Sequence, residues 1–340
     1  MAIRRDVRPQ IAQVTPEAAI TGGEFQISGK YFAKTDRPRV MIGEVAAPIV
    51  IGSDSFVIAR VPEGASAGEL TIESGKHCSA AWTCDIGISI ADNLHPVANP
   101  AVDQFGNVYS TFSGSRGQKV PVAVYKIDLN YNMKPFINDM MNATSLIFDR
   151  EGLLYISSRF DGIVYQVTPS GNMSVYVEGM GVATGLAMDE ENNLYVGDRS
   201  GTIFKISPSR QIFVFATLEP SISAYHLAFG PDRYLYVTGP TTSSFDSIYR
   251  ISHAGDVETF YRGVGRPQGM AFDDEGRLYV SASLAGRKGI VRIGQDREAK
   301  LAISGPGIVG LSFTPSQAII VATTNALYRV DAGIKGRQFA

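Results

Sequence analysis

Two neighbouring positions recur along the chain and together could line a polar binding site. The first, five residues before a repeated turn, holds Ala98, Thr144, Thr184, Tyr225, Gln268 and Val309. The second holds Asn99, Ser145, Gly185, His226, Gly269 and Gly310. Their hydroxyl, amide and imidazole groups could hydrogen-bond a neutral or anionic small molecule, or a peptide. His226 is the candidate general acid or base, because imidazole titrates near neutral pH.

Charged side chains are expected at the mouth of the same site. The segments that should join the second and third strands of each repeat carry Arg116, Arg159, Asp198, Arg199 and Arg287. Arginine forks bind carboxylates and phosphates, so this mouth could accept an anion. Structural alternatives stay open. His226 could be a hydrogen-bonded part of the channel lining, and Arg159 and Arg199 could be solvated or paired with Asp161 and Asp198.

No motif supplies a nucleophile or a cofactor site. The chain has no G-x-S-x-G elbow, P-loop or H-E-x-x-H motif. Hard divalent cations prefer carboxylate-rich oxygen sites, and the recurrent positions hold no carboxylate. We therefore predict neither a cofactor nor a metal. The residues expected to bind a ligand are Asn99, Thr144, Ser145, Arg159, Thr184, Asp198, Arg199, Tyr225 and Gln268.

The common frame of these positions is a repeat of about 40 to 46 residues. Its turn positions are Asp103, Asp149, Asp189, Gly230, Asp273 and Thr314. Such a period with short strands inside each unit is typical of β-propeller blades, so the sequence predicts an all-β fold with six blades. The aspartates should bind backbone amides in turns on the face opposite the polar site. Core tyrosines are expected at Tyr109, Tyr155, Tyr195, Tyr236 and Tyr279.

Residues 8–92 lack the repeat and contain short strands separated by turn residues, which predicts a β-sandwich. The patterns I-x-x-V-x-P, G-G, F-x-I-S-G-x-x-F, V-x-I-G, V-P-x-G and G-x-L-T-I follow one another in this segment. In this order they resemble the IPT/TIG immunoglobulin-like domain. The resemblance implies a spacer or interface module that could contact a protein partner. We place this domain at 1–90 and the propeller at 91–340.

Residues 93–331 resemble six-bladed propellers of the NHL-repeat and gluconolactonase/senescence-marker-protein kinds, most closely in the segment 266–280. In the gluconolactonase-like families, Glu, Asn, Asn and Asp side chains at the start of inner strands bind a metal. The corresponding positions here run from Ala98 to Val309 and depart from that set. We therefore expect a ligand-binding propeller of unassigned activity with its site in the central funnel face. The alternatives are a gluconolactonase-like hydrolase or lyase with a metal-poor site, and a protein-interaction scaffold.

The last repeat has three strands followed by a short polar tail, so it lacks an outer strand. The segment at about 85–91 resembles the outer strands that precede other repeats. We predict that it completes the last blade. Because the same segment ends the sandwich, the junction between the two domains should be nearly rigid.

Composition limits the partners and the compartment. The net charge is -2, the pI is near 6.1 and Lys and Arg are scattered, so no nucleic acid or membrane partner is expected. No signal peptide is visible, which indicates the cytoplasm if the chain is complete, or the periplasm or exterior if a signal was removed. Cys78 and Cys84 are interpreted as two free thiols, with a small disulfide loop as the alternative.

Overall fold

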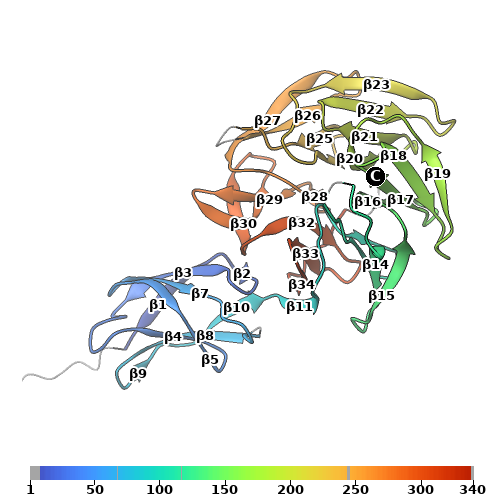
Figure 1. The fold of residues 1–340 in the computed structure, drawn as a ribbon. Coiled ribbons are helices and arrows are strands. Elements are labelled where there is room, and N and C mark those ends of the chain that lie inside the picture. Colours follow the sequence, from blue (N-terminus) through green and yellow to red (C-terminus); the bar gives the residue numbers. More distant parts are fainter. Residues whose placement is uncertain (1–7, 67, 116, 243–245, 338–340) are drawn as a thin grey trace, which may run out of the picture.

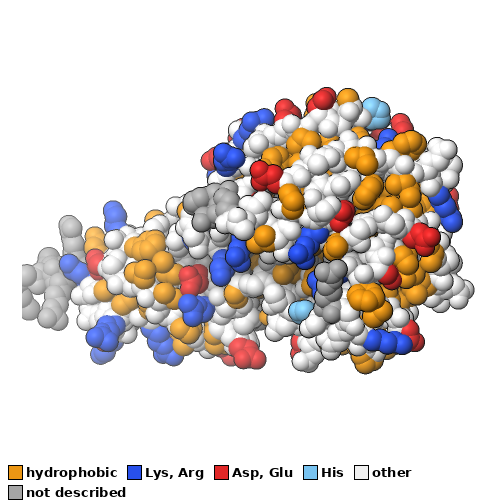
Figure 2. Space-filling model, turned by 45° about the horizontal axis from the view of Figure 1, so that its top comes forward, with side chains coloured by type: hydrophobic (Ala, Val, Ile, Leu, Met, Phe, Trp, Pro, Cys, Tyr) orange, Lys and Arg blue, Asp and Glu red, His pale blue; other side chains and the backbone are white. Residues whose placement is uncertain are grey.

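The computed structural model describes residues 8–66, 68–115, 117–242 and 246–337, and every regular element in these ranges is a β-strand. The chain forms an N-terminal β-sandwich and a β-propeller (Figure 1). The prediction of an all-β propeller fold is confirmed. Within the described ranges no helix has the length and apolar character needed to cross a bilayer. Acidic and basic side chains are interspersed on the face shown in Figure 2.

The sandwich consists of two sheets that enclose one apolar core. The first has the order β1-β3-β7-β6, and the second contains β2-β10-β8-β4-β5, with β9 paired to β8. The strands are β1 (Gln10–Thr15), β2 (Ala18–Ala19), β3 (Glu24–Lys30), β4 (Arg39–Ile42), β5 (Val45–Ala47), β6 (Ile49–Gly52), β7 (Phe56–Arg60), β8 (Gly68–Ser74), β9 (His77–Cys78) and β10 (Trp82–Ile86). Alternating residues of β3 and β8, such as Phe25, Ile27, Leu70 and Ile72, face the core because successive strand side chains point to opposite sides.

In the described ranges, the repeats form six four-stranded antiparallel units. The first unit consists of β12 (Ala101–Val102), β13 (Val108–Thr111), β14 (Val122–Ile127) and β15 (Met133–Asn138), and the second of β16 (Ala143–Phe148), β17 (Leu154–Ser158), β18 (Ile163–Val167) and β19 (Met173–Val177). The third unit consists of β20 (Ala183–Met188), β21 (Leu194–Asp198), β22 (Thr202–Ile206) and β23 (Ile212–Thr217). The fourth consists of β24 (His226–Phe229), β25 (Leu235–Thr238), β26 (Asp246–Ile251) and β27 (Val257–Val264). The fifth is β28 (Met270–Phe272), β29 (Leu278–Leu284), β30 (Arg287–Ile293) and β31 (Ala299–Ser304). The sixth contains β32 (Ile308–Phe313), β33 (Ile319–Thr323), β34 (Leu327–Val330) and β11 (Ile88–Ala91).

The repeated aspartates stabilise the turns between first and second strands. Asp189 Oδ1 accepts hydrogen bonds from the amides of Glu191 (3.0 Å) and Asn193 (2.8 Å), and Oδ2 accepts one from the Tyr195 hydroxyl at 3.1 Å. Asp149 binds its turn in the same way. The turn role predicted for these carboxylates is therefore confirmed, and their hydrogen-bonding capacity is already used.

The repeated tyrosines are core residues, as predicted. Each is buried, and all except Tyr155 pack edge-to-face against a phenylalanine at the end of the next unit's first strand. Tyr109 contacts Phe148 with ring centroids 5.1 Å apart, and Tyr195 contacts Phe229 at 5.0 Å. These contacts join neighbouring units and place the phenylalanines around the centre of the propeller.

A strand from the N-terminal side completes the sixth unit. β11 pairs antiparallel with β34, with Ile88 opposite Arg329. The predicted shared strand is confirmed. The change from sandwich to propeller falls at Gly87, where a Cβ atom would lie 2.9 Å from side-chain atoms of both Ile20 and Val330. Only a residue without a side chain fits between the two domains at this point.

A second connection fixes the sandwich against the fifth unit. β2 runs parallel to both β10 and β31, so one ten-stranded sheet continues from the sandwich into the propeller. Ile20 is buried in a cluster with Tyr279, Ile290 and Ile303. Figure 1 shows β2 beside the fifth and sixth units. Backbone pairing and apolar burial thus make the junction rigid.

Candidate functional site

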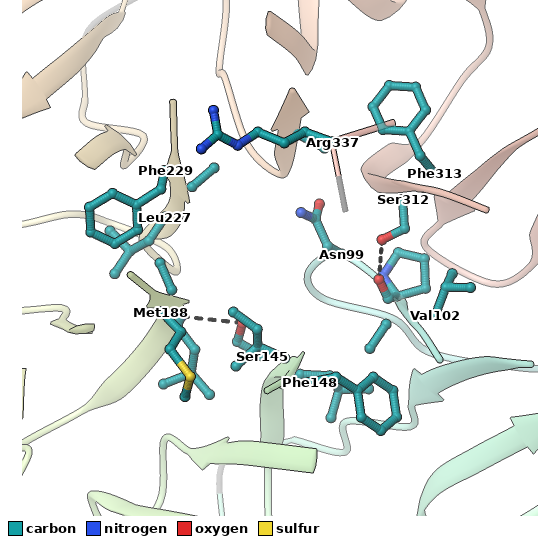
Figure 3. A pocket seen from close by; sticks show the side chains of 18 of the residues that line it. Asn99, Val102, Ser145, Phe148, Met188, Leu227, Phe229, Ser312, Phe313 and Arg337 are labelled. Carbon is teal, nitrogen blue, oxygen red and sulfur yellow. Dashed lines mark hydrogen bonds between the residues drawn. The ribbon is translucent and has the colours of Figure 1, made fainter. Parts of the chain in front are cut away.

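The inner strands surround a cavity with a volume of about 230 Å³. Its wall includes the last residue of each inner strand, and we call these six residues the apolar collar: Val102, Phe148, Met188, Phe229, Phe272 and Phe313 (Figure 3). The turn residues Asp103 and Asp149 also line the cavity. The cavity therefore extends toward the face where inner strands end, which is opposite the face on which the sequence placed the binding funnel.

Three of the predicted site residues line this cavity, namely the ligand-binding candidates Asn99 and Ser145 and the acid or base candidate His226, and Asn99 is the most constrained of them. Its Nδ2 donates to the Met270 carbonyl at 2.8 Å, and its Oδ1 accepts from the Leu311 amide at 3.1 Å. A Cβ atom at Gly269 or Gly310 would collide with Asn99. Asn99 therefore joins the first, fifth and sixth units, and its amide is mainly structural.

Ser145 and His226 are the other two. The Ser145 hydroxyl accepts the Leu186 amide at 3.3 Å and links the second and third units (Figure 3). His226 begins β24 and is buried. Burial lowers the pKa of His226 to about 4, because the charged imidazolium loses its hydration. The side chain is therefore neutral at pH 7 and can donate or accept a hydrogen bond at the cavity wall.

The other polar positions at the inner-strand starts do not belong to the cavity lining. Thr144 Oγ1 donates to the Asn142 carbonyl at 3.0 Å, and Thr184 Oγ1 donates to the Gly197 carbonyl at 2.8 Å. The Tyr225 hydroxyl donates to the Glu219 carbonyl. Gln268 is half-buried, and its carbonyl accepts from Thr238 Oγ1 at 2.7 Å. Most of these groups therefore hold neighbouring backbone in place.

The metal site of the gluconolactonase-like families does not fit these residues. The equivalent positions carry no carboxylate, and the hydroxyls of Thr144, Thr184 and Tyr225 already donate to carbonyls. Among the described residues, no group of three His, Cys, Asp or Glu side chains is arranged to hold a metal. A divalent cation placed here would lose hydration without gaining charged oxygen ligands.

Three of the predicted rim residues, Arg159, Asp198 and Arg199, lie at the face where the inner strands begin, and they have different roles. Asp198 is buried, and its Oδ1 accepts the Val182 amide at 2.8 Å. Arg159 donates from Nη2 to the Gly114 carbonyl at 2.9 Å. Arg199 is exposed.

Arg287, which was expected at the same mouth, does not contribute to it. Arg287 contacts the sandwich instead: Nη2 donates to the Thr15 carbonyl at 3.0 Å. Its predicted place at the funnel mouth is wrong, because the β29–β30 hairpin of the fifth unit meets the N-terminal domain. Arg116 lies outside the described residues.

The apolar collar and Arg337 were not predicted from the sequence. Collar residues could have been found, since the residue before each repeated turn is apolar in all six units. Arg337 carries no sequence signal, because it follows the last repeat. The chain brings it across the propeller: its amide donates to the Phe272 carbonyl at 2.9 Å, and its side chain extends over the cavity toward Phe229 (Figure 3).

A second cavity of about 280 Å³ lies on the same face, between the third and fourth units. Acidic residues 189–191 and the aromatic rings of Tyr195 and Phe215 line it. It shares Phe229 and Arg337 with the central cavity. The two cavities are therefore neighbours across the Arg337 side chain.

No family model and no curated protein matches this chain. Among solved structures, a gluconolactonase from Xanthomonas campestris matches with 15% identity and a TM-score of 0.62, over 73% of this chain and 89% of that one. Streptogramin B lyase matches with 15% identity and a TM-score of 0.53, over 72% and 96%. An auxiliary nutrient binding protein from Bacteroides thetaiotaomicron matches with 11% identity and a TM-score of 0.56, over 96% and 98%. At these identities the likeness establishes the propeller fold alone.

Proposed function

We propose that this chain is a binding protein whose small-molecule ligand occupies the cavity inside the apolar collar. The observation that carries the proposal is the composition of this wall. Aromatic and aliphatic residues line much of the cavity, and the polar groups of Asn99, Ser145, His226 and Ser312 lie among them, together with the charged groups of Asp103, Asp149, Arg150 and Arg337. Ligand sites in proteins have this combination of apolar wall and few orienting polar groups.

The likeness to nutrient-binding proteins supports a binding role. The Bacteroides protein covers almost the whole chain, sandwich included, whereas the gluconolactonase covers about three quarters of it. We infer that the N-terminal sandwich is an IPT/TIG-like, immunoglobulin-like module and that the propeller has six NHL-like blades. Strand β2 pairs with β10 of the sandwich and with β31 of the propeller, which supports a role for the sandwich in positioning the propeller.

A gluconolactonase-like hydrolase or lyase is the second candidate, because the gluconolactonase has the higher TM-score. In that case the imidazole of His226, which is neutral at pH 7, would act as the general base. The structural roles of Thr144, Thr184 and Tyr225 argue against a metal-dependent version. A lactone assay with and without chelator separates the two candidates, since turnover would favour the hydrolase and its sensitivity to chelator would show whether a metal takes part.

Methionine methyl groups provide a direct test of the binding proposal. Met188 and Met270 line the cavity, whereas Met133 and Met173 are exposed on outer strands. In a screen of small metabolites and fragments against protein labelled at methionine methyls, we expect a ligand to shift the signals of Met188 and Met270 only. A screen in which hits shift only outer methyls, or none, contradicts the proposal.

A matched pair of variants then locates the ligand. Ser312→Phe places a ring in the cavity wall, whereas Ser316→Phe places the same ring on an exposed turn outside that cavity. We expect Ser312→Phe to abolish the shifts and Ser316→Phe to keep them. Thermal unfolding of both variants checks that each is folded, because overpacking alone costs about 1–3 kcal/mol.

A further inference from the structure

We propose that Arg337 recognises the ligand's anionic group, and that the ligand is a small carboxylate with an apolar body. The inference rests on the proposed function, since it concerns the same cavity. Arg337 ends the segment Ile334–Arg337, which we call the C-terminal segment. Arg337 is the one residue of this segment that lines the cavity.

The backbone of the C-terminal segment is fixed at three points. The Ile334 amide donates to the Gln317 carbonyl at 3.0 Å, and the Lys335 carbonyl accepts the Asp274 amide at 2.9 Å. The Arg337 amide donates to the Phe272 carbonyl at 2.9 Å. The segment therefore crosses the ends of the fifth and sixth units with defined geometry.

Close packing at Gly336 fixes the direction of the next side chain. A Cβ atom at Gly336 would lie 2.0 Å from the Cβ of Phe313, so only glycine fits there. Gly336 also forms a bridge to the turn residue Asp273. Arg337 is thereby aimed across the cavity rather than into solvent, and Figure 3 shows its guanidinium reaching toward Phe229.

The guanidinium of Arg337 has capacity for a ligand. Its Nη2 lies 3.5 Å from Glu190 Oε1, whereas Arg233 Nη2 approaches the other oxygen of Glu190 at 2.8 Å. Strong charge-assisted bonds measure about 2.7–2.9 Å, so the Arg337 contact is loose. For the residues described, no closer side-chain partner of Arg337 is found. A guanidinium has five donors and binds a planar carboxylate with two of them.

Two aspartates and two arginines line the cavity, so their formal charges balance, and the position of each group decides which one can meet a ligand. Asp103 and Asp149 line the cavity, but each Oδ1 accepts two backbone amides of its own turn. Arg150 also lines the cavity and is exposed. Arg337, whose side chain extends over the cavity, is therefore the cation placed to meet an anion whose apolar part would contact the collar. A carboxylate attached to an aromatic or aliphatic body matches both features.

The test compares benzoate with its neutral counterpart benzamide at millimolar concentrations, in low salt. Shifts of the Met188 and Met270 methyl signals report binding in the cavity. We expect benzoate to bind the natural protein about tenfold more tightly than benzamide, the size of effect given by one charge-assisted pair. Arg337→Gln should remove this preference and leave benzamide binding unchanged. Lys335→Ala is the control, because Lys335 pairs with Asp274 on the same segment and does not line the cavity.

A variant that is expected to bind benzoate more tightly distinguishes a specific effect on Arg337 from a folding defect, because a misfolded protein would not gain affinity. Glu190→Gln removes the carboxylate that competes for Arg337, so benzoate should bind several-fold more tightly while benzamide does not. Equal binding of both probes, or an equal loss of both in Arg337→Gln, overturns the anion inference and leaves the cavity as a ligand site. If neither probe shifts the cavity methyls, the inference is also overturned, and the fragment screen decides separately whether the cavity binds a ligand.

Discussion

Arg287 of the propeller donates from Nη1 to Oε1 of Gln26 in the sandwich at 3.1 Å. Its Nη2 donates to the carbonyls of Thr15 (3.0 Å) and Glu24 (3.3 Å). Burial lowers the pKa of the Arg287 guanidinium, and the nearby Glu24 carboxylate partly opposes this effect. One half-buried cation thus joins two strands of the sandwich to the β29–β30 hairpin.

Replacing Arg287 should therefore weaken the junction between the domains. Arg287→Ala leaves the Thr15 and Glu24 carbonyls without their donor, and we expect a loss of about 1–3 kcal/mol in the free energy of unfolding. Lys288→Ala removes the exposed cation next in sequence and should change stability by less than about 0.5 kcal/mol. Urea unfolding of the three proteins measures both values. Equal midpoints for the two variants would show that the Arg287 contacts contribute nothing.

The propeller repeat could be predicted from the sequence because each of its features is local. Asp189 and Asn193 lie within one turn, and Tyr195 reaches the same carboxylate from the following strand. The position of Arg287 could not be predicted in this way. Its repeat frame places it at a hairpin tip, and only the three-dimensional course of residues 15–26 brings partners to it.

The shared strand β11 leads to a prediction about truncation. A fragment of residues 93–340 lacks β11 and exposes the edge of β34, whereas a fragment of residues 87–340 keeps that pair. Open strand edges promote aggregation, so the shorter fragment should be the less soluble one. Size-exclusion chromatography of both fragments compares them under identical conditions. A monomeric 93–340 fragment as stable as 87–340 would contradict a structural role for β11.

The two cysteines should differ in reactivity. Both are free thiols: Cys78 is exposed on β9 and Cys84 is buried on β10. Burial, with a smaller effect from Asp85, raises the pKa of Cys84 to about 11, so its reactive thiolate is scarce at pH 8. We expect a thiol reagent to label one cysteine rapidly and the second only after unfolding. The variant Cys78→Ser should lose the rapid phase, and two equally fast phases would contradict the prediction.

The candidate site was harder to predict than the fold. Ser145 and His226 were found because the repeat frame aligns the starts of the inner strands, and both line the cavity. Thr144 and Tyr225 share that frame, yet their hydroxyls bond to backbone carbonyls of neighbouring segments. Sequence cannot distinguish a polar group that faces a cavity from one that holds a loop. Arg337 reaches the cavity through a tail outside any repeat.

The buried histidine gives the last prediction, a dependence of stability on pH. The folded pKa of His226 is about 4, below the value of about 6.5 for a solvated histidine. Between these values the unfolded chain binds a proton that the folded chain does not. His226 therefore lowers stability as the pH falls from about 6.5 toward 4, and this loss is complete below 4.

Within that window the effect amounts to about 1.4 kcal/mol for each pH unit. Because glutamine does not titrate, the stability of His226→Gln relative to the natural protein should rise by about this amount per unit as the pH falls from 6 to 5. His253→Gln, which replaces an exposed histidine, is the control. Urea unfolding at pH 7, 6 and 5 measures the difference. A constant difference between the natural protein and His226→Gln across this range would show that the imidazole is not buried in its neutral form.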